Sequence, residues 1–267
     1  MTALPETVSA DVRRERIISL LAEHEFVRVT DLAEQFGVSS VTIRADLDAL
    51  GEQRAIRRVR GGAMLARPPQ SVEPSFEVSL GSAALEKTLI AKAAAQLVSN
   101  GESIIIDAGT TATFVARELA ARATLTDVVV FTNGLRTALE LEPAIPRFSV
   151  LVTGGTLRPA KHSLVDPLGA PMLERIHADT IFLGAHGIHP KAGVTSLNLQ
   201  EAEMKSRMIQ AAARRILVAD SSKLGNVELA PVCLLNDIHL LITGNHADPA
   251  VVTALRDQGM EIELIGV

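Results

Sequence analysis

A series of short apolar runs between residues 103 and 265 constrains the fold of this chain more than any other feature. The runs consist largely of Val, Ile and Leu, without the polar alternation of a strand that has one face in water. Most are separated by helical patterns. They are Ser103–Ile106, Val128–Phe131, Ser149–Val152, Thr180–Leu183, Ile216–Ala219, Leu240–Thr243 and Ile262–Ile265. Strands covered on both faces and joined by helices predict an α/β domain with a doubly wound, mostly parallel sheet.

Small and polar residues follow the ends of several of these strands, where ligands bind in doubly wound sheets. The first strand leads through Asp107-Ala108-Gly109-Thr110-Thr111 directly into a helix pattern. A glycine lets an anion approach the backbone, threonine hydroxyls can donate to it, and a helix N-terminus supplies free N–H groups. These residues predict a phosphate site, although Thr and Gly are also ordinary helix caps. The segment lacks the Gly-Lys of a P-loop and the three glycines of a dinucleotide fingerprint, which disfavours both nucleotide sites.

The same edge of the predicted sheet collects further candidates for a ligand site. The candidates for binding an effector are Asp107, Gly109, Thr110, Thr111, Thr132, Asn133, Gly154, Gly155, His186 and Lys223. Lys223 follows an acidic residue and two serines, so it is the cation expected to neutralise a phosphorylated group; the alternative is a solvated surface charge. His186 and His189 have no carboxylate or thiol nearby in the sequence, so we expect them to line the pocket rather than bind a metal. No metal or cofactor is predicted.

A second pattern, in residues 12–64, predicts a DNA-binding unit. Val12–Leu21 is a helix pattern, Phe26–Val29 is extended, and Thr30-Asp31 should cap a second helix that stops at Gly37. A third helix begins with Ser39 or Ser40 as its N-cap. A short basic β-hairpin follows it. This is the order of a winged helix-turn-helix domain.

The third helix should bury one face and expose the other. At about 100° per residue, Ile43, Leu47 and Leu50 fall on one stripe, which leaves Val41 and Arg44 on the opposite arc. A small apolar residue beside an arginine suits the major groove, which offers thymine methyl groups and guanine acceptors. The alternative is an ordinary amphipathic surface helix whose exposed face contacts only solvent.

The hairpin, Ala55–Met64, turns at Gly61-Gly62 and contains arginines without any acidic residue. That pattern is expected of a surface that lies against phosphates. Together with the third helix it defines the candidates for DNA contact, which are Ser40, Val41, Thr42, Arg44, Arg57, Arg58 and Arg60.

Charge and composition narrow the choice of partners. The net charge is −5, but residues 1–67 hold ten Arg and ten Asp or Glu, so the acidity belongs to the remainder, with 16 basic and 21 acidic residues. Trp and Tyr are absent and only seven Phe occur, which disfavours stacking on unpaired bases and favours duplex DNA.

Cys233 is the only cysteine, which excludes an internal disulfide and a thiolate metal cluster. No apolar stretch reaches about 18 residues and no signal core is evident, so we expect a cytoplasmic protein without a membrane partner.

Prolines mark the predicted boundary between the two parts. Pro68, Pro69 and Pro74 lie in the stretch Ala66–Ser79 and hold it extended. The predicted organisation is a winged helix-turn-helix domain in residues 1–65, a linker in residues 66–80 and an effector-sensing domain in residues 81–267.

Motifs in both parts resemble the DeoR family of bacterial transcriptional repressors. The runs SSVTIRADL, from Ser39, and RRVRGGA, from Arg57, resemble its DNA-binding signature. Glu86-Lys87, Ile90-Ala91, DAGTT, TN, GG, FLGAHGI and ADSSK resemble its sugar-phosphate-sensing half and occur in the family's order. The sensing half is in turn similar to ribose-phosphate isomerase and coenzyme A transferase folds. This chain departs from the family at four positions, which are Ala45, Arg54, Asp166 and Gly244; an aspartate is usual at the last of these.

The resemblance implies a homo-oligomeric repressor of a sugar-metabolism operon, a dimer or larger, that leaves its operator DNA when a phosphorylated sugar binds. The alternative is a sugar-phosphate isomerase with a DNA-binding appendage. Isomerisation needs a carboxylate base. The loop Gly184–His189 has no Asp or Glu where the resembling isomerases place acidic residues, but the helix after it carries Glu201 and Glu203. We therefore expect a regulator rather than an enzyme. A purely architectural DNA-binding protein would have no use for the long α/β domain.

Overall fold

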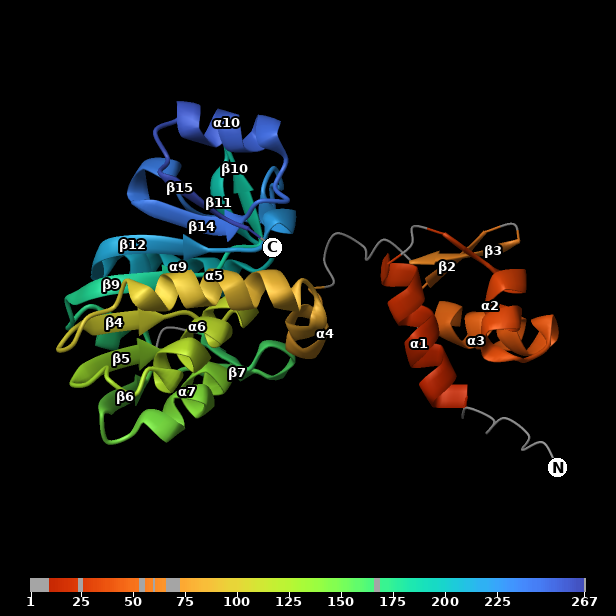
Figure 1. Cartoon of the computed structure of the whole chain (residues 1–267), viewed down its shortest axis with the longest axis horizontal. Helices are drawn as coiled ribbons and strands as arrows, with labels where there is room; N and C mark the ends of the chain where they lie inside the picture. Colours follow the sequence, from red (N-terminus) through yellow and green to blue (C-terminus); the bar gives the residue numbers. More distant parts are fainter. Residues whose placement is uncertain are drawn as a thin grey trace. The chain divides into compact units, whose positions relative to one another are not determined.

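The computed structural model describes residues 10–23, 26–52, 56–59, 61–65, 73–165 and 169–266. The chain divides into two compact units, residues 1–73 and 74–267 (Figure 1). Arg54, Asp166 and residues 66–72 of the predicted linker lie outside the described residues. Within the described part, no helix is both long and apolar enough to cross a membrane.

The first unit is a three-helix domain with a small antiparallel sheet. The helices are α1 (Ala10–Glu23), α2 (Val29–Phe36) and α3 (Ser40–Glu52), and the strands β1 (Val27–Arg28), β2 (Ile56–Val59) and β3 (Gly62–Leu65) form a sheet in the order β1-β3-β2. The three helices and the sheet share one core, whose fully buried members include Ile17, Leu32, Ile43 and Leu47. The predicted winged helix-turn-helix fold is confirmed.

The start of α2 differs from the prediction. Thr30 and Asp31 do not cap it, because the helix already begins at Val29, after Arg28, which makes no side-chain cap bond. The reason is tertiary: Val27 and Arg28 pair with β3, and the Val29 N–H donates to the Gly61 carbonyl at 3.0 Å. The chain therefore passes straight from strand to helix. The predicted end of α2 is correct, since Gly37 adopts the left-handed conformation (φ +63°).

The two glycines of the wing have separate structural reasons. Gly61 turns the hairpin at φ +87°. Gly62 is already in β3, and a Cβ there would collide with the Val27 carbonyl oxygen and the Phe26 ring. One glycine therefore provides the turn and the other permits close pairing with β1.

The second unit contains a seven-stranded sheet in the order β15-β14-β12-β9-β4-β5-β6, in which every neighbouring pair is parallel. Its strands are β4 (Ser103–Ile106), β5 (Val128–Thr132), β6 (Phe148–Val152), β9 (Ala178–Leu183), β12 (Ala212–Val218), β14 (Leu240–Gly244) and β15 (Ile262–Ile265). The predicted doubly wound parallel sheet is confirmed.

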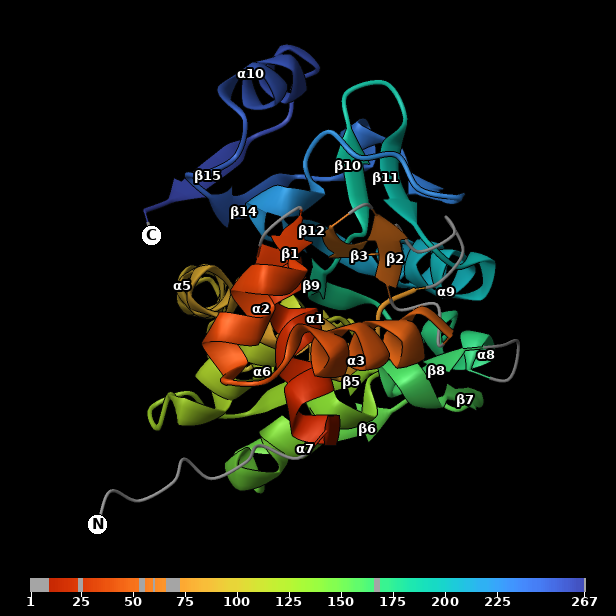
Figure 2. The same cartoon turned by 90° about the vertical axis from the view of Figure 1, so that its right-hand side faces the viewer.

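Helices cover both faces of this sheet. They are α4 (Phe76–Gly81), α5 (Ala84–Gln96), α6 (Thr110–Ala121), α7 (Leu135–Leu141), α8 (Ala170–Leu173), α9 (Leu199–Gln210) and α10 (Pro249–Asp257), with short 3-10 turns η1 (Glu142–Ala144), η2 (Pro159–Lys161), η3 (Ser221–Lys223) and η4 (Leu235–Asp237). Successive residues of β4 belong to different cores: Ile104 belongs to the core that includes residues of α5 and α6, whereas Ile105 belongs to the core that includes residues of α9 and α10. Figure 2 shows α5 and α6 on one side of the sheet and α9 on the other. This explains the unbroken apolar pattern of the strands.

Three features of the second unit were not predicted from the sequence. A hairpin of β7 (Thr156–Arg158) and β8 (Ser163–Val165) follows β6, and a small antiparallel sheet joins β10 (Gly187–His189), β11 (Gly193–Ser196) and β13 (Ala230–Cys233). Helix α4 lies in the stretch predicted as linker. Its signal was a serine N-cap, because the Ser75 Oγ accepts from the Val78 N–H.

The order of the strands places the site. From β4 the chain adds β5 and β6 on one side, and then β9, β12, β14 and β15 on the other. The direction of winding reverses between β4 and β9, so their carboxyl ends border the crevice in which doubly wound sheets bind ligands.

Candidate functional site

Helix α3 presents the outer face expected of a DNA-reading helix. Val41 is 71% exposed and Arg44 and Ala45 are exposed, whereas Ile43 and Leu47 are fully buried. Ser39 is the residue that caps the helix, because its Oγ accepts from the Thr42 N–H at 3.1 Å. Ser40 is the first helical residue, and both it and Thr42 are partly exposed beside this face.

A buried ion-pair cluster that no local sequence pattern marks joins α3 to α1. The Asp46 carboxylate, with a side chain 3% exposed, accepts from Arg13 Nε at 2.6 Å and from Arg14 Nε at 3.0 Å. Asp46 follows Ala45 directly and lies on the border of the apolar stripe. The cluster fixes the rotation of α3 and leaves the exposed Arg44 available for a partner.

The wing is less uniformly cationic in space than in sequence. Arg58 of β2 forms an ion pair with Asp48 of α3, and both side chains are exposed. The prediction of an acid-free surface is therefore corrected at Arg58, because the helix supplies the acid that the hairpin lacks. Arg60 and the side chain of Arg57 lie outside the described residues.

The second unit contains a cavity of about 270 Å³ where β4, β9 and β12 end. Six of the ten predicted effector residues line it, which are Asp107, Gly109, Thr110, Thr111, His186 and Lys223. Lys87, Lys161, Glu201, Lys205, Asp220 and Asn226 also line it and were not predicted as effector residues. Lys161 comes from η2 and Lys205 from α9, so the cavity gathers cations from distant parts of the chain.

Thr132, Asn133, Gly154 and Gly155 do not line this cavity. The Asn133 Nδ2 donates to the Leu164 carbonyl at 3.1 Å, and the Leu164 N–H donates back to the Asn133 carbonyl at 2.8 Å. Gly155 adopts φ +130°, and a Cβ there would collide with the Val165 carbonyl oxygen. The β7–β8 hairpin thus uses the strand-end groups that the sequence assigned to a ligand.

One end of the cavity has the chemistry of an anion site. Gly109 is the N-cap of α6 and has no side chain to cap the helix, and Gly109, Thr110 and Thr111 all line the cavity, so the N-terminus of α6 lies at the cavity wall. Thr110 and Thr111 add hydroxyl groups. Among the described residues, no carboxylate lies within ion-pair distance of Lys223, although Asp220 begins the same turn and accepts from the Ser222 N–H at 3.2 Å.

A buried ion pair forms the floor between β4 and β9. Lys205 pairs with Asp107 and donates to the Gly184 carbonyl at 3.0 Å, while the Gly184 N–H donates to Asp107 Oδ2 at 3.0 Å. Asp107 is therefore occupied by protein donors rather than open to a ligand alone. The pair joins residues 98 positions apart, which is why the sequence did not reveal it.

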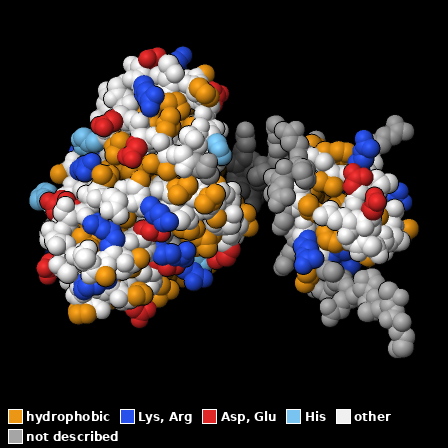
Figure 3. All heavy atoms as spheres, viewed as in Figure 1, with side chains coloured by type: hydrophobic (Ala, Val, Ile, Leu, Met, Phe, Trp, Pro, Cys, Tyr) orange, Lys and Arg blue, Asp and Glu red, His pale blue; other side chains and the backbone are white. Residues whose placement is uncertain are grey.

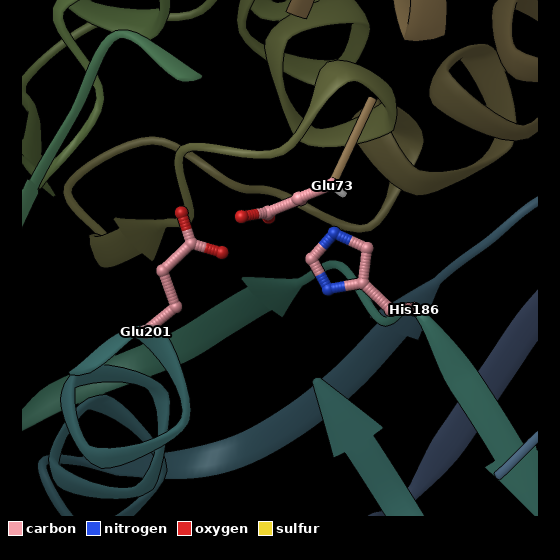
Figure 4. Close-up of side chains that lie close together, drawn as sticks. All are labelled: Glu73, His186 and Glu201. Atoms are coloured by element: carbon pink, nitrogen blue, oxygen red, sulfur yellow. The ribbon is translucent and has the colours of Figure 1, made fainter. Parts of the chain in front are cut away.

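His186 lies beside a carboxylate that the sequence did not place there. Figure 4 shows the side chains of His186 and Glu201 directed toward the same space. A ring nitrogen of His186 and a carboxylate oxygen of Glu201 lie within 4.8 Å of each other. Glu201 in turn pairs with Arg158 and accepts from the Ser163 Oγ at 3.0 Å. The expectation that no carboxylate lies near His186 is corrected.

Burial holds the His186 imidazole neutral. Desolvation, reinforced by Lys205, Lys161, Lys223 and Arg158, lowers the pKa of His186 to about 2. Its Nδ1 accepts from the Leu197 N–H at 3.4 Å, which assigns the ring proton to Nε2. A neutral ring beside a carboxylate is suited to hydrogen bonding with hydroxyl groups.

The visible face of the second unit carries charged side chains of both signs (Figure 3). On the face visible in Figure 3, acidic and basic side chains are interspersed. The acidity of residues 74–267 therefore does not define a single binding patch on that face.

Known proteins match both units of the chain. The family models that match are the DeoR-like helix-turn-helix domain, over residues 13–68, and the DeoR C terminal sensor domain, over residues 82–245. The HTH-type transcriptional regulator GolR of Listeria innocua serovar 6a is 36% identical over 252 residues, which cover 94% of this chain and 97% of that protein.

Two further relatives are repressors by name. GlcR of Bacillus subtilis (strain 168) is 32% identical over 246 residues, 92% of this chain and 93% of that protein. CsqR of Escherichia coli (strain K12) is 31% identical over 257 residues, 96% of each. Ribose 5-phosphate isomerase A of Methanocaldococcus jannaschii aligns with 51% of this chain and 52% of that chain at 19% identity, with a TM-score of only 0.38. The expectation of a regulator rather than an enzyme agrees with these relatives, and the chain is a DNA-binding transcriptional regulator that belongs to the DeoR family.

Proposed function

We propose that this regulator represses a sugar-metabolism operon and leaves its operator when a phosphorylated sugar occupies the cavity of the second unit. The observation that carries the proposal is that Lys223 and the uncapped N-terminus of α6 line one and the same cavity. A cation and free helix N–H groups together recognise a phosphate better than a neutral group.

The remaining lining suits the sugar. His186 offers a neutral N–H, Glu201 accepts hydrogen bonds, and Asn226 can do both. A cavity of about 270 Å³ holds a small molecule and is small for a dinucleotide. The resemblance of DAGTT and ADSSK to the family's sensing motifs supports the same ligand class.

The test is operator release measured by fluorescence anisotropy, on a duplex selected by the protein from random-sequence DNA. Ribose 5-phosphate, fructose 6-phosphate and glucose 6-phosphate are titrated, each beside its unphosphorylated parent. We expect at least one phosphate ester to release the duplex and its parent to fail. Release by the parent sugars at equal concentration would contradict a phosphate site.

Lys223→Met should bind the operator as the wild type does but need about 10- to 100-fold more effector for release. A charge-assisted hydrogen bond contributes about 1.5–3 kcal/mol, and the population shift requires several kcal/mol of differential affinity. Lys191→Met is the matched control, because Lys191 is an exposed lysine outside the cavity lining. An unchanged response of Lys223→Met would remove Lys223 from the site.

For the DNA-binding unit we propose that Arg44 reads a base edge and that Arg58 contacts phosphate, with Ser40, Val41, Thr42, Arg57 and Arg60 as the other contacts. Arg44→Ala should cost about 1–3 kcal/mol on the operator and relax the preference at one base pair. Arg58→Ala should weaken operator and scrambled duplexes alike. Equal losses on both duplexes for Arg44→Ala would show that α3 is oriented differently on DNA.

A symmetric homo-oligomer would place two such units on a repeated or palindromic site and gain effective concentration. Sedimentation of the full chain would show a dimer or larger species. A monomer at the concentration that binds operator would contradict this part of the proposal.

A further inference from the structure

Helix α4 is the first element of the second unit and also part of the cavity wall. The unit begins at Pro74, and α4 starts two residues later. Phe76 is 3% exposed, and Phe76, Val78 and Ser79 all line the cavity. The chain that arrives from the DNA-binding unit thus enters the second unit through a helix that a ligand in the cavity would touch.

Lys87 holds the end of α4. Its side chain is 3% exposed, and its Nζ donates to the Ser79 carbonyl at 2.5 Å and to the Ser82 carbonyl at 2.8 Å. The last carbonyls of a helix have no partner within the helix, so a cation there satisfies them and interacts favourably with the helix dipole. These bonds fix the C-terminal turn of α4 to α5.

The same ammonium faces the cavity's anion end. Lys87 Nζ lies 3.7 Å from Asp220 Oδ2, and Asp220 begins the turn η3 that carries Lys223. Burial lowers the pKa of Lys87; Asp220 opposes this effect and Lys223 adds to it. The Lys87 ammonium therefore responds to the charge on both residues.

Glu86, the neighbour of Lys87, accepts hydrogen bonds from the turn η3. Its carboxylate accepts from the Ser221 N–H at 2.7 Å and from the Ser221 Oγ at 3.3 Å. Gly244 makes room for it, since a Cβ at Gly244 would collide with the Glu86 carboxylate. Two adjacent residues of α5 thus connect η3, which carries Lys223, with the end of α4.

We propose that Lys87 is a positioning residue that couples occupancy of the cavity to α4 and hence to the chain that leads to the DNA-binding unit. The proposal rests on the proposed function. A phosphate beside Lys223 neutralises one of the charges that Lys87 faces and adds an anion that competes with the Ser79 and Ser82 carbonyls for its three N–H groups. Redistribution of those bonds changes how the last turn of α4 is held.

Reciprocal coupling is the direct test. If an effector weakens operator binding by some factor, the operator weakens effector binding by the same factor. Both are measured on the full chain with the selected duplex and the sugar phosphate from the panel that releases it, by anisotropy and by calorimetric titration. Lys87→Met should bind operator within about threefold of the wild type, bind the effector more weakly because an ammonium that lines the cavity is lost, and show at saturating effector a coupling factor at least tenfold smaller.

Matched variants separate coupling from folding. Lys92→Met removes an exposed lysine from the same helix α5 and should couple as the wild type does. Lys87→Arg should restore part of the coupling. If Lys87→Met does not fold, Asp220→Asn replaces it, because Asn caps η3 as Asp does but lacks the charge that faces Lys87; its coupling factor should also fall.

A wild-type coupling factor in Lys87→Met, or in Asp220→Asn if that variant is needed, would overturn the inference. Its failure is distinct from failure of the proposed function. In the latter case the wild type itself shows no effector binding and no release with any of the sugar phosphates.

Discussion

The carboxyl ends of β4, β9 and β12 open into a cavity, whereas the residues that follow β5 in the same sheet bond to the β7–β8 hairpin. Both groups end in small and polar residues: Asp107 to Thr111 follow β4, and Thr132, the last residue of β5, is followed by Asn133 and Gly134. In the first group Gly109, Thr110 and Thr111 line the cavity. In the second, Asn133 bonds both ways to Leu164.

This difference shows that polar groups at the end of a strand need hydrogen-bond partners, and that the partner need not be a ligand. A buried backbone or side-chain group must find a partner, and a neighbouring strand satisfies it as well as a ligand does. At β5 the partner is a hairpin of two three-residue strands, β7 and β8.

The largest expected effect concerns Gly155, which immediately precedes the β7–β8 hairpin. Gly155→Ala should lower the free energy of unfolding by about 3 kcal/mol, because φ +130° is strained for any side chain and the Cβ would collide with the Val165 carbonyl. Urea denaturation of the full chain followed by circular dichroism measures it. The matched change on the open side is Gly109→Ala.

At Gly109 the backbone is ordinary (φ −70°), and a Cβ would lie 3.6 Å from Asp107 Oδ2. Stability should change by less than about 1 kcal/mol. Equal losses in the free energy of unfolding for Gly155→Ala and Gly109→Ala would contradict the difference between the strand ends that contact the hairpin and those that open into the cavity.

An intermediate effect concerns the buried charges of the open side. Because the pKa of His186 is lowered to about 2 in the folded state, the unfolded chain binds a proton below its ordinary pKa of about 6.5 that the folded chain does not. Stability should therefore fall as the pH decreases from 6.5, by about 2 kcal/mol at pH 5 from this residue. His186→Gln should remove that part of the pH dependence, and a variant with the wild-type slope would contradict the burial argument.

The smallest expected effect concerns Asn133, which follows β5 and bonds to Leu164 of the β7–β8 hairpin. Asn133→Ala should lower the free energy of unfolding by about 1 kcal/mol, because the Leu164 carbonyl loses a hydrogen bond. Effector-dependent release of the operator should stay as in the wild type. Loss of release in a stable Asn133→Ala protein would return Asn133 to the effector site.

Prediction from sequence succeeded where the signal was local, as it is in a continuous apolar run or in the helical spacing of apolar residues. Ser103–Ile106 and Ile262–Ile265 are strands with the predicted bounds, and Ile43, Leu47 and Leu50 are buried on the inner face of α3. These elements follow from local spacing, which is independent of the rest of the chain. Six of ten predicted effector residues line the cavity because parallel strands bring their carboxyl ends to one edge.

Prediction failed where residues distant in sequence share a charge or a hydrogen bond. Asp46 with Arg13, Asp48 with Arg58, and Lys205 with Asp107 are ion pairs that no local pattern marks. The buried carboxylate of Asp46 needs its cations, since an unpaired charge away from water is costly.

The sequence by itself determined the class of fold, the two-part organisation and the chemistry of the strand ends, because apolar periodicity and helix signals act within a few residues. The tertiary structure alone decided which strand ends open into the cavity, which cations surround His186, and that Lys87 joins α4 to the turn carrying Lys223. Those outcomes depend on how elements far apart along the chain are packed together: Lys205 and Asp107 are 98 residues apart, and Glu86 and Ser221 are 135 residues apart. A group's environment in the packed sheet, rather than its neighbours along the chain, sets its partners and its charge state.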